Sequence, residues 1–169
     1  THAAPEPATF MGYVRPDGRV ATRNYIGVLS TVNCSATVSK YVAQHFTPER
    51  LAAFPNVDGV VPITHSIGCG MDSNGKGMDV LRRTIAGYVR HANFAGIVII
   101  GLGCEANQMD ALFAAQHLDE SPLLKPLIIQ TEGGMSAKPF SAGSLGLIEK
   151  AAPTLAAAHS ISRAVSVPV

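Results

Sequence analysis

The stretch GIVIIGL, residues Gly96–Leu102, decides the fold class of this chain of 169 residues. It is an apolar run bounded by glycines, which is typical of a strand covered on both faces of a parallel sheet. Two β-branched runs precede it, Tyr25–Ser30 and Gly59–Thr64, and Leu127–Thr131 follows it. Segments with helical spacing separate these runs. This alternation predicts an α/β fold, with a mainly parallel sheet of about four to five strands flanked by helices in a Rossmann-like layered arrangement.

Caps, prolines and glycines place the remaining elements. Pro62 lies inside the second strand, which indicates an edge position or a bulge because proline cannot donate to the ladder. Asn33 or Ser35 is expected to cap the first helix, which runs to about His45. Further helices are expected over residues 78–91, 107–117 and 141–158, with loops over 66–77 and 133–136 and a short turn over 48–52.

The two ends of the chain differ from its middle. Phe10–Val14 and Arg19–Ala21 flank a Pro-Asp-Gly turn, which predicts a short N-terminal β-hairpin. The first nine residues are rich in proline and alanine and show no periodicity. The sequence is therefore divided into residues 1–9 as a linker or an end added by cloning, residues 10–160 as a single α/β domain, and residues 161–169 as a tail.

The composition excludes several classes of protein. Hydrophobic residues make up 47% of the chain and charged residues 15%, which indicates a globular core and not disorder. A net charge of +1 offers no basis for binding nucleic acid or an anionic membrane. No apolar run approaches the roughly 20 residues that span a bilayer, and no signal-peptide pattern opens the sequence. Three cysteines, an odd number, argue against a disulfide framework, so we expect a cytoplasmic protein.

The three cysteines occur at one recurring kind of position. Cys34, Cys69 and Cys104 each follow a predicted strand, and 35 residues separate each from the next. This interval is about the length of one βα unit. Residues just beyond the carboxyl ends of parallel strands line the ligand crevice of such folds, so we expect the three thiols on one rim. Their neighbours there are Asn33, Ser35, His65, Glu105 and Gln108.

Three interpretations of these cysteines remain open. Thiolates are soft ligands for iron, zinc or an iron–sulfur cluster. Three thiolates around a [4Fe–4S] cluster leave one iron open as a Lewis acid, which suits the dehydration of hydroxy acids. The spacing does not match the local CxxC pairs of structural zinc sites or ferredoxins. The cysteines would otherwise form a catalytic rim without metal, or pack as small apolar side chains at tight turns.

Charged and polar residues add to this hypothesis. His65 can act as a general base, an acid or a metal ligand, or else cap its loop through backbone hydrogen bonds. Glu105 opens a helix, where the dipole favours it, and it can also hold a sugar hydroxyl or a metal. Arg23 and Asn24 precede the first strand, so they belong to the opposite end of the sheet; Arg23 suits a carboxylate or a neighbouring domain. Three cations lie near the rim and are either substrate-binding or solvated: Lys76, Arg82 and Arg83.

Four long stretches make the sequence resemble a known family. The sequence is similar, in order and over nearly its whole length after residue 9, to the central (second) domain of the D-galactarate dehydratase/altronate dehydratase (altronate hydrolase) family. Two small departures are Ala21 and Ser66, where the family tends to have glycine. The stretches that carry the resemblance are Gly12–Val38, Gly59–Met71, Leu81–Gln108 and Leu127–Gly134.

The resemblance implies a carbon–oxygen lyase (hydro-lyase) that converts sugar acids such as altronate or galactarate to 2-keto-3-deoxy acids. Family members need iron (Fe²⁺) or another divalent metal. They are much longer than this chain, with an N-terminal and a C-terminal domain that are both missing here. The central domain also contributes to homodimer contacts. We therefore expect this domain to be catalytically incomplete alone, with the missing domains and a second copy as partners.

On this interpretation the residues divide into three roles. Two rival functions stay open: a sulfolactate sulfo-lyase of the same lineage, and a non-catalytic dimerisation or scaffold domain. The proposed catalytic residues are His65, Cys69 and Glu105; the substrate-binding residues are Arg23, Asn24, Asn33, Ser35 and Gln108; the metal ligands are Cys34, Cys69 and Cys104.

Overall fold

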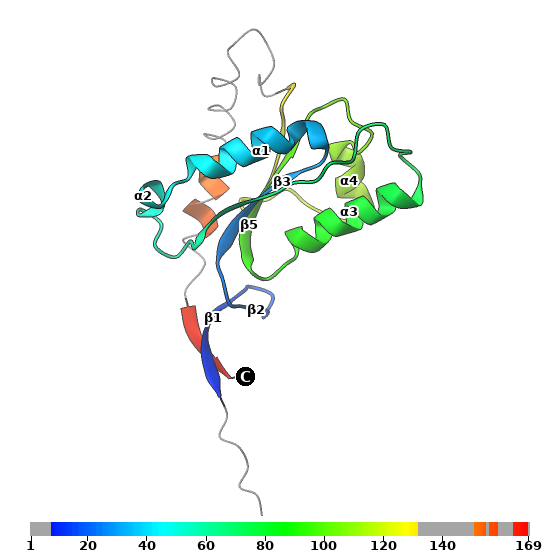
Figure 1. The fold of residues 1–169 in the computed structure, drawn as a ribbon. Helices are drawn as coiled ribbons and strands as arrows, with labels where there is room; N and C mark the ends of the chain where they lie inside the picture. The colour runs from blue at the N-terminus through cyan, green and yellow to red at the C-terminus, as the bar shows by residue number, and fades with distance from the viewer. Residues whose placement is uncertain (1–7, 132–150, 155, 159–163, 169) are drawn as a thin grey trace, which may run out of the picture.

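The computed structural model describes residues 8–131, 151–154, 156–158 and 164–168 (Figure 1). Its larger sheet has four strands, and every neighbouring pair runs parallel. The predicted α/β fold is therefore confirmed. In spatial order the strands are β4 (Gly59–Ile63), β3 (Tyr25–Ser30), β5 (Phe94–Gly101) and β6 (Leu124–Ile128).

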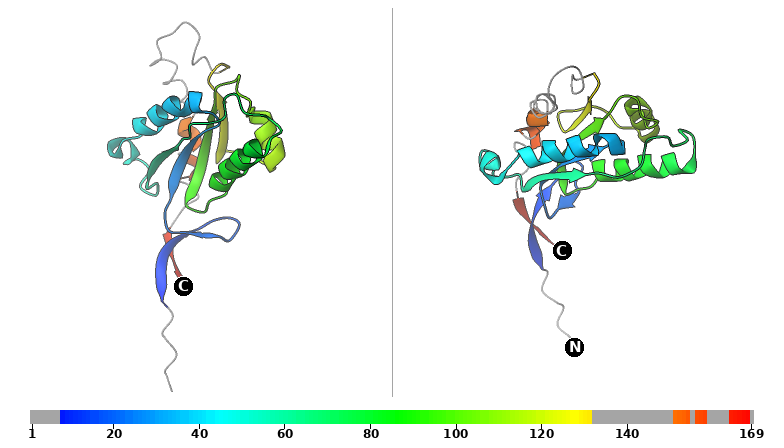
Figure 2. Two further views of the ribbon diagram at one scale, coloured as in Figure 1. Left: turned by 45° about the vertical axis from the view of Figure 1, so that its right-hand side comes forward. Right: turned by 45° about the horizontal axis from the view of Figure 1, so that its top comes forward.

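Helices cover both faces of this sheet (Figures 1 and 2). Because side chains alternate along a strand, Val28 and Leu29 enter opposite layers of the core. Helix α1 (Asn33–His45) packs on the face of Val28, together with the helical residues 151–154 and 156–158. Helices α3 (Lys76–Val89) and α4 (Met109–Gln116) pack on the face of Leu29. A short helix, α2 (Pro48–Leu51), follows α1.

A second, smaller sheet projects from the main body (Figure 2). Its order is β2 (Val20–Ala21), β1 (Thr9–Val14), β7 (Ala164–Pro168), and both pairings are antiparallel. The predicted hairpin is present: the Gly18 amide donates to the Arg15 carbonyl at 2.9 Å, and Gly18 takes the positive φ of 83° that its turn requires. The sequence pattern predicts no element in the last nine residues, because β7 finds its partner only at the other end of the chain.

Both edge strands of the larger sheet contain a proline, and the sequence predicts only one of the two correctly. Pro62 lies in β4, which is an edge strand as predicted. The sequence pattern places Pro126 just before its strand, but β6 begins earlier and contains it. An edge strand tolerates this residue because one of its sides needs no ladder donor. The expected loop over 133–136 and the first part of the expected helix over 141–158 lie outside the described residues.

The start of α1 also differs from expectation. Its N-cap is Val32, and neither Asn33 nor Ser35 caps it. The Ser35 hydroxyl instead donates to the Ile100 carbonyl at 2.7 Å, so it joins α1 to β5. Within the described residues, no helix is both long and apolar enough to cross a membrane.

Candidate functional site

The three cysteines lie in the connections that leave the carboxyl ends of β3, β4 and β5. Cys34 is in the first turn of α1, Cys69 is in the loop between β4 and α3, and Cys104 is in the loop between β5 and α4. All three are exposed and free of disulfides. Since the strands are parallel, these connections emerge at one edge of the sheet. We call Cys34, Cys69 and Cys104 the thiol rim.

The loop that carries Cys69 lies directly on the segment that leads to Cys34. The Asn33 amide donates to the Ile67 carbonyl at 2.9 Å. Gly68 has a φ of 103°, and a Cβ atom there would lie 2.8 Å from the Thr31 carbonyl oxygen. Only glycine combines this backbone conformation with so close an approach. The contact brings the first two thiols of the rim together.

The electrostatics of Cys34 reflect its neighbours. Desolvation is the largest cause that raises the pKa of the Cys34 thiol. The charge of a Cys69 thiolate, a hydrogen bond with Cys69 and the charge of a Cys104 thiolate raise this pKa further. Like charges at short range disfavour joint ionisation. Cys34 is therefore close enough to both other cysteines of the rim for their charge to disfavour its ionisation.

The carboxylate of Glu105 holds the loop that carries Cys104 through hydrogen bonds. Its side chain is only 5% exposed. Oε1 accepts hydrogen bonds from the Thr31 hydroxyl at 2.7 Å and the Leu102 amide at 3.1 Å, and Oε2 accepts one from the Gly103 amide at 2.6 Å. The carboxylate thus joins the end of β3 to the loop after β5. Its acceptor sites face protein donors, which suits a positioning role.

Both ring nitrogens of His65 contact the backbone. Nε2 lies 3.0 Å from the Ser30 carbonyl, to which it must donate, and Nδ1 accepts from the Ile67 amide at 3.4 Å. These partners assign the tautomer with the proton on Nε2. This geometry matches the alternative in which His65 caps its loop through backbone hydrogen bonds. The bond between Nδ1 and the Ile67 amide is the longer of the two, so it is the one that breaks more easily.

A groove of about 280 Å³ runs between β4 and α3, beside His65. Its walls are mainly aliphatic and include the exposed Ile67 and Val80. Among the buried side chains of the described residues, the Ser30 hydroxyl is the only polar group without a hydrogen-bond partner, and Ser30 lines this groove. The groove adjoins the thiol rim, but its apolar walls do not suit a polyhydroxy acid.

The remaining predicted residues of the rim divide into exposed and buried ones. Asn33 and Gln108 are exposed beside the thiols. The Gln108 amide donates to the Glu105 carbonyl at 2.5 Å and to the Gly103 carbonyl at 3.3 Å. Ser35 is fully buried beneath them. Asn33 and Gln108 are therefore the two amides that a ligand on the rim can reach.

Arg23 and Asn24 lie at the start of β3, at the end of the sheet away from the thiols. Arg23 is exposed, and its guanidinium donates to the Thr22 carbonyl at 3.2 Å. Asn24 is fully buried; it accepts from Arg15 at 2.7 Å and donates to the Asn56 carbonyl at 2.5 Å. These two residues are not brought together with the thiol rim.

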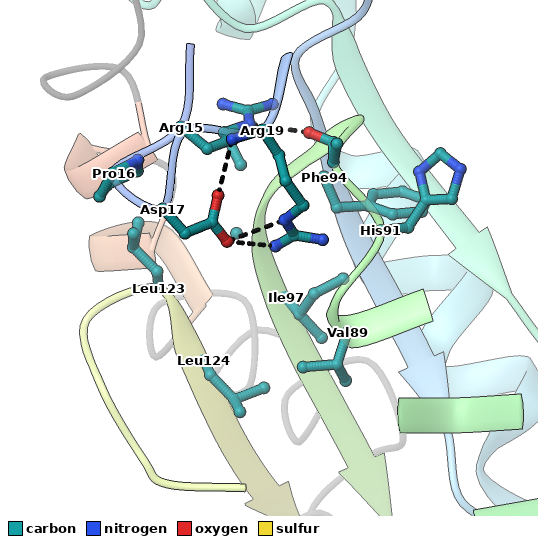
Figure 3. A pocket seen from close by; sticks show the side chains of 13 residues that line it. Arg15, Pro16, Asp17, Arg19, Val89, His91, Phe94, Ile97, Leu123 and Leu124 are labelled. Carbon is teal, nitrogen blue, oxygen red and sulfur yellow. Dashed lines mark hydrogen bonds and ion pairs between the residues drawn. The ribbon is translucent and has the colours of Figure 1, made fainter. Parts of the chain in front are cut away.

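A hollow of about 190 Å³ lies at that same end, under the turn between β1 and β2 (Figure 3). Its two arginines are engaged by protein acceptors. Arg19 pairs with Asp17 at 2.7 Å, and Arg15 donates to the Ala92 carbonyl at 2.7 Å. The rest of the lining is largely apolar, including Phe94. These protein acceptors hold the arginine side chains against the walls of the hollow, away from the thiol rim.

Sequence reasoning missed the network behind the rim. Asn107 is fully buried; its Nδ2 donates to the Thr31 carbonyl at 3.4 Å, and its Oδ1 accepts from Arg82 Nε at 3.1 Å. The signal available in sequence was the cluster of small and amide residues just after β3 and β5. In the described part of the chain, no group of three or more His, Cys, Asp and Glu side chains is arranged to hold a metal ion.

A parallel α/β domain whose strand ends present thiols, amides and a histidine is of the class that binds ligands at its carboxyl edge. The chain belongs to the D-galactarate dehydratase/altronate hydrolase family, because the model of that family's second domain matches residues 12–152. This confirms the resemblance identified from sequence.

Three curated relatives support the assignment. The chain is 30% identical over 104 residues to an altronate dehydratase of Bacillus subtilis (62% of this chain, 20% of the relative). It is 35% identical over 101 residues to an altronate dehydratase of Escherichia coli (59% and 19%). It is 41% identical over 108 residues to a galactarate dehydratase (L-threo-forming) of E. coli (63% and 21%). The matched part thus spans about a fifth of the length of these relatives.

Proposed function

We propose that this chain is the second domain of a hydro-lyase that dehydrates sugar acids of the altronate/galactarate type to 2-keto-3-deoxy acids. The observation that carries the proposal is the thiol rim, three exposed cysteines at the carboxyl ends of neighbouring strands, with Cys34 close enough to the other two to be affected by their charge. Relatives named altronate and galactarate dehydratases support the substrate class. The proposed partners are the further domains of a longer enzyme and a second copy, in the reducing cytoplasm that free thiols favour.

The dehydration sets the demands on these residues. A base removes the proton next to the carboxylate, the resulting dianion needs stabilisation, and an acid assists loss of the β-hydroxyl. His65 serves as the base or acid once Nδ1 leaves the Ile67 amide. Cys69 faces the substrate, and the amides of Asn33 and Gln108 orient its hydroxyls. Glu105 holds the Cys104 loop in place.

Iron held by the thiol rim is the second part of the proposal. A metal ion would need ligands from other domains as well, since no group of three or more His, Cys, Asp and Glu side chains among the described residues is arranged to hold one. In an iron–sulfur cluster the cysteines bind different irons, so three thiols suffice without surrounding one ion. The thiol donors of Cys34, Cys69 and Cys104 are of the soft type that suits such a cluster, and its positive irons would offset the repulsion between the thiolates. When bound, it would supply an open iron as a Lewis acid.

Metal content is the decisive measurement. After anaerobic reconstitution we expect bound iron and acid-labile sulfide, with a visible charge-transfer spectrum. Cys34→Ser, Cys69→Ser and Cys104→Ser should each remove most of the iron, whereas Ser66→Ala, an exposed neighbour, should retain it. Iron retained by all three cysteine variants would place the metal elsewhere. A substrate panel on the full-length enzyme then separates the activities: sulfite released from sulfolactate in place of sugar-acid dehydration would overturn the substrate class.

His65 can be tested with a matched pair of variants in the full-length enzyme. His65→Ala is expected to lower kcat by about 100-fold or more, because proton transfer is lost. His65→Gln keeps a donor for the Ser30 carbonyl and cannot exchange a proton near neutral pH. Activity equally low in both variants supports proton transfer. Recovery in the glutamine variant would reduce His65 to a loop cap.

A further inference from the structure

The guanidinium of Arg82 on α3 is hydrogen-bonded to a neutral side chain, whereas the ion-paired cations of the described residues contact carboxylates. Its Nε donates to the Asn107 side chain at 3.1 Å, and that partner is neutral. The two ion pairs found among the described residues are Arg19–Asp17 and Lys125–Glu120. Arg82 is in neither, so no carboxylate of the described residues lies within ion-pair distance of its guanidinium.

Asn107 ties this arginine to the thiol rim. It is fully buried, and its other side-chain atom donates to the Thr31 carbonyl at the end of β3. Thr31 in turn donates to Glu105, which fastens the Cys104 loop. The Arg82 head group is thus two hydrogen bonds from the segment that leads to Cys34. It belongs to the same end of the sheet as the thiols.

The chemistry of this arrangement favours an anion. With Nε engaged, both Nη groups have no hydrogen-bond partner among the described residues, and they form the planar fork that matches a carboxylate. An amide anchor fixes the orientation of the guanidinium without consuming its charge, which lowers the entropy lost when a ligand binds. The neighbouring Arg83 is exposed on the same helix, and no side chain of the described residues anchors it in this way.

We propose that Arg82, oriented by Asn107, binds the carboxylate of the substrate at the thiol rim. This inference rests on the proposed sugar-acid substrate and names the residue that recognises its acid group. The carboxylate held there would lie at the same end of the sheet as the thiol rim, next to the segment that leads to Cys34.

The test compares an acid with its neutral amide in the full-length enzyme. Arg82→Gln is expected to raise KM for altronate by about 10- to 100-fold, the loss of a charge-assisted hydrogen bond, with a smaller change in kcat. Competitive inhibition by altronamide should stay unchanged, since it has no carboxylate. Arg83→Gln is the matched control and should leave both values unchanged. Arg82→Lys, which keeps the charge but loses the fork, should fall between.

Each other outcome has a defined meaning. If Arg82→Gln weakens acid and amide equally, or neither, Arg82 only links α3 to the loop before α4, and the inference is wrong. The same holds if Arg83→Gln has the larger effect on KM. If the wild-type enzyme neither converts nor binds any sugar acid, the proposed function itself fails, and that result does not depend on any arginine variant.

Discussion

Glu105→Ala is expected to lower the free energy of unfolding by about 3–4 kcal/mol, because one buried hydroxyl and two half-buried amides lose their charged acceptor at once. The donors left behind are the Thr31 hydroxyl, which is fully buried, and the amides of Leu102 and Gly103, which are half-buried. Glu105→Gln keeps the shape but turns an amide group toward one of these donors, so a loss of about 1–3 kcal/mol is expected. Urea unfolding of the 169-residue chain measures both values.

An exposed carboxylate provides the control for this change. Glu120 pairs with Lys125, and its side chain is 53% exposed. Glu120→Gln should change stability by about 0–1 kcal/mol, as exposed ion pairs do. A Glu105→Ala variant as stable as the Glu120 variant would show that the carboxylate does not hold the Cys104 loop. Equal iron content in the wild type and in Glu105→Gln would limit its role to stability.

Gly68→Ala is expected to cost about 2–4 kcal/mol and to separate Cys69 from Cys34. The cost has two parts: a φ of 103° that alanine avoids, and a Cβ atom 2.8 Å from the Thr31 carbonyl oxygen. Gly70→Ala is the matched control, since Gly70 also has a positive φ, 68°, but nothing lies within 4 Å of the position that a Cβ atom would take there. That variant should cost only about 1–2 kcal/mol.

Thiol reactivity provides a second readout for the same pair. The pKa of Cys34 is raised in the native protein, so its alkylation rate should rise only at a pH above that of an ordinary thiol. Gly68→Ala moves Cys69 away and should lower this pKa in part, because desolvation, the largest cause, remains. Gly70→Ala should leave it raised. An unchanged alkylation profile in Gly68→Ala would mean that the Gly68 contact does not set the coupling.

Local patterns explain which parts of the fold are predictable. The strand Tyr25–Ser30 is predicted with its observed bounds, because an apolar run ending in small polar residues encodes them. The cysteines fall at the strand ends because the spacing of βα units is regular. Pro126 misleads the assignment of β6, since a proline that starts a strand and one inside an edge strand look alike in sequence.

The buried hydrogen bonds that hold the thiol rim cannot be predicted from the sequence, because their partners come from distant segments. Glu105 meets Thr31, and Asn107 meets Arg82, only after separate βα units have packed together. Sequence identifies residues that can form hydrogen bonds, and it does not specify partners so far apart in the chain. For the same reason His65 is a candidate base in sequence, while its backbone contacts emerge only in the fold.

The pairing of β1 with β7 has a consequence for the order of folding. It joins Thr9 to Pro168, so it closes almost the entire chain into a loop, whereas each βα unit of the larger sheet joins nearer neighbours. Closing so long a loop costs the most chain entropy, so this pairing is expected to form after the contacts between nearer segments. The parallel sheet and the thiol rim can therefore assemble first, with the smaller antiparallel sheet completed afterwards and opening earliest on unfolding.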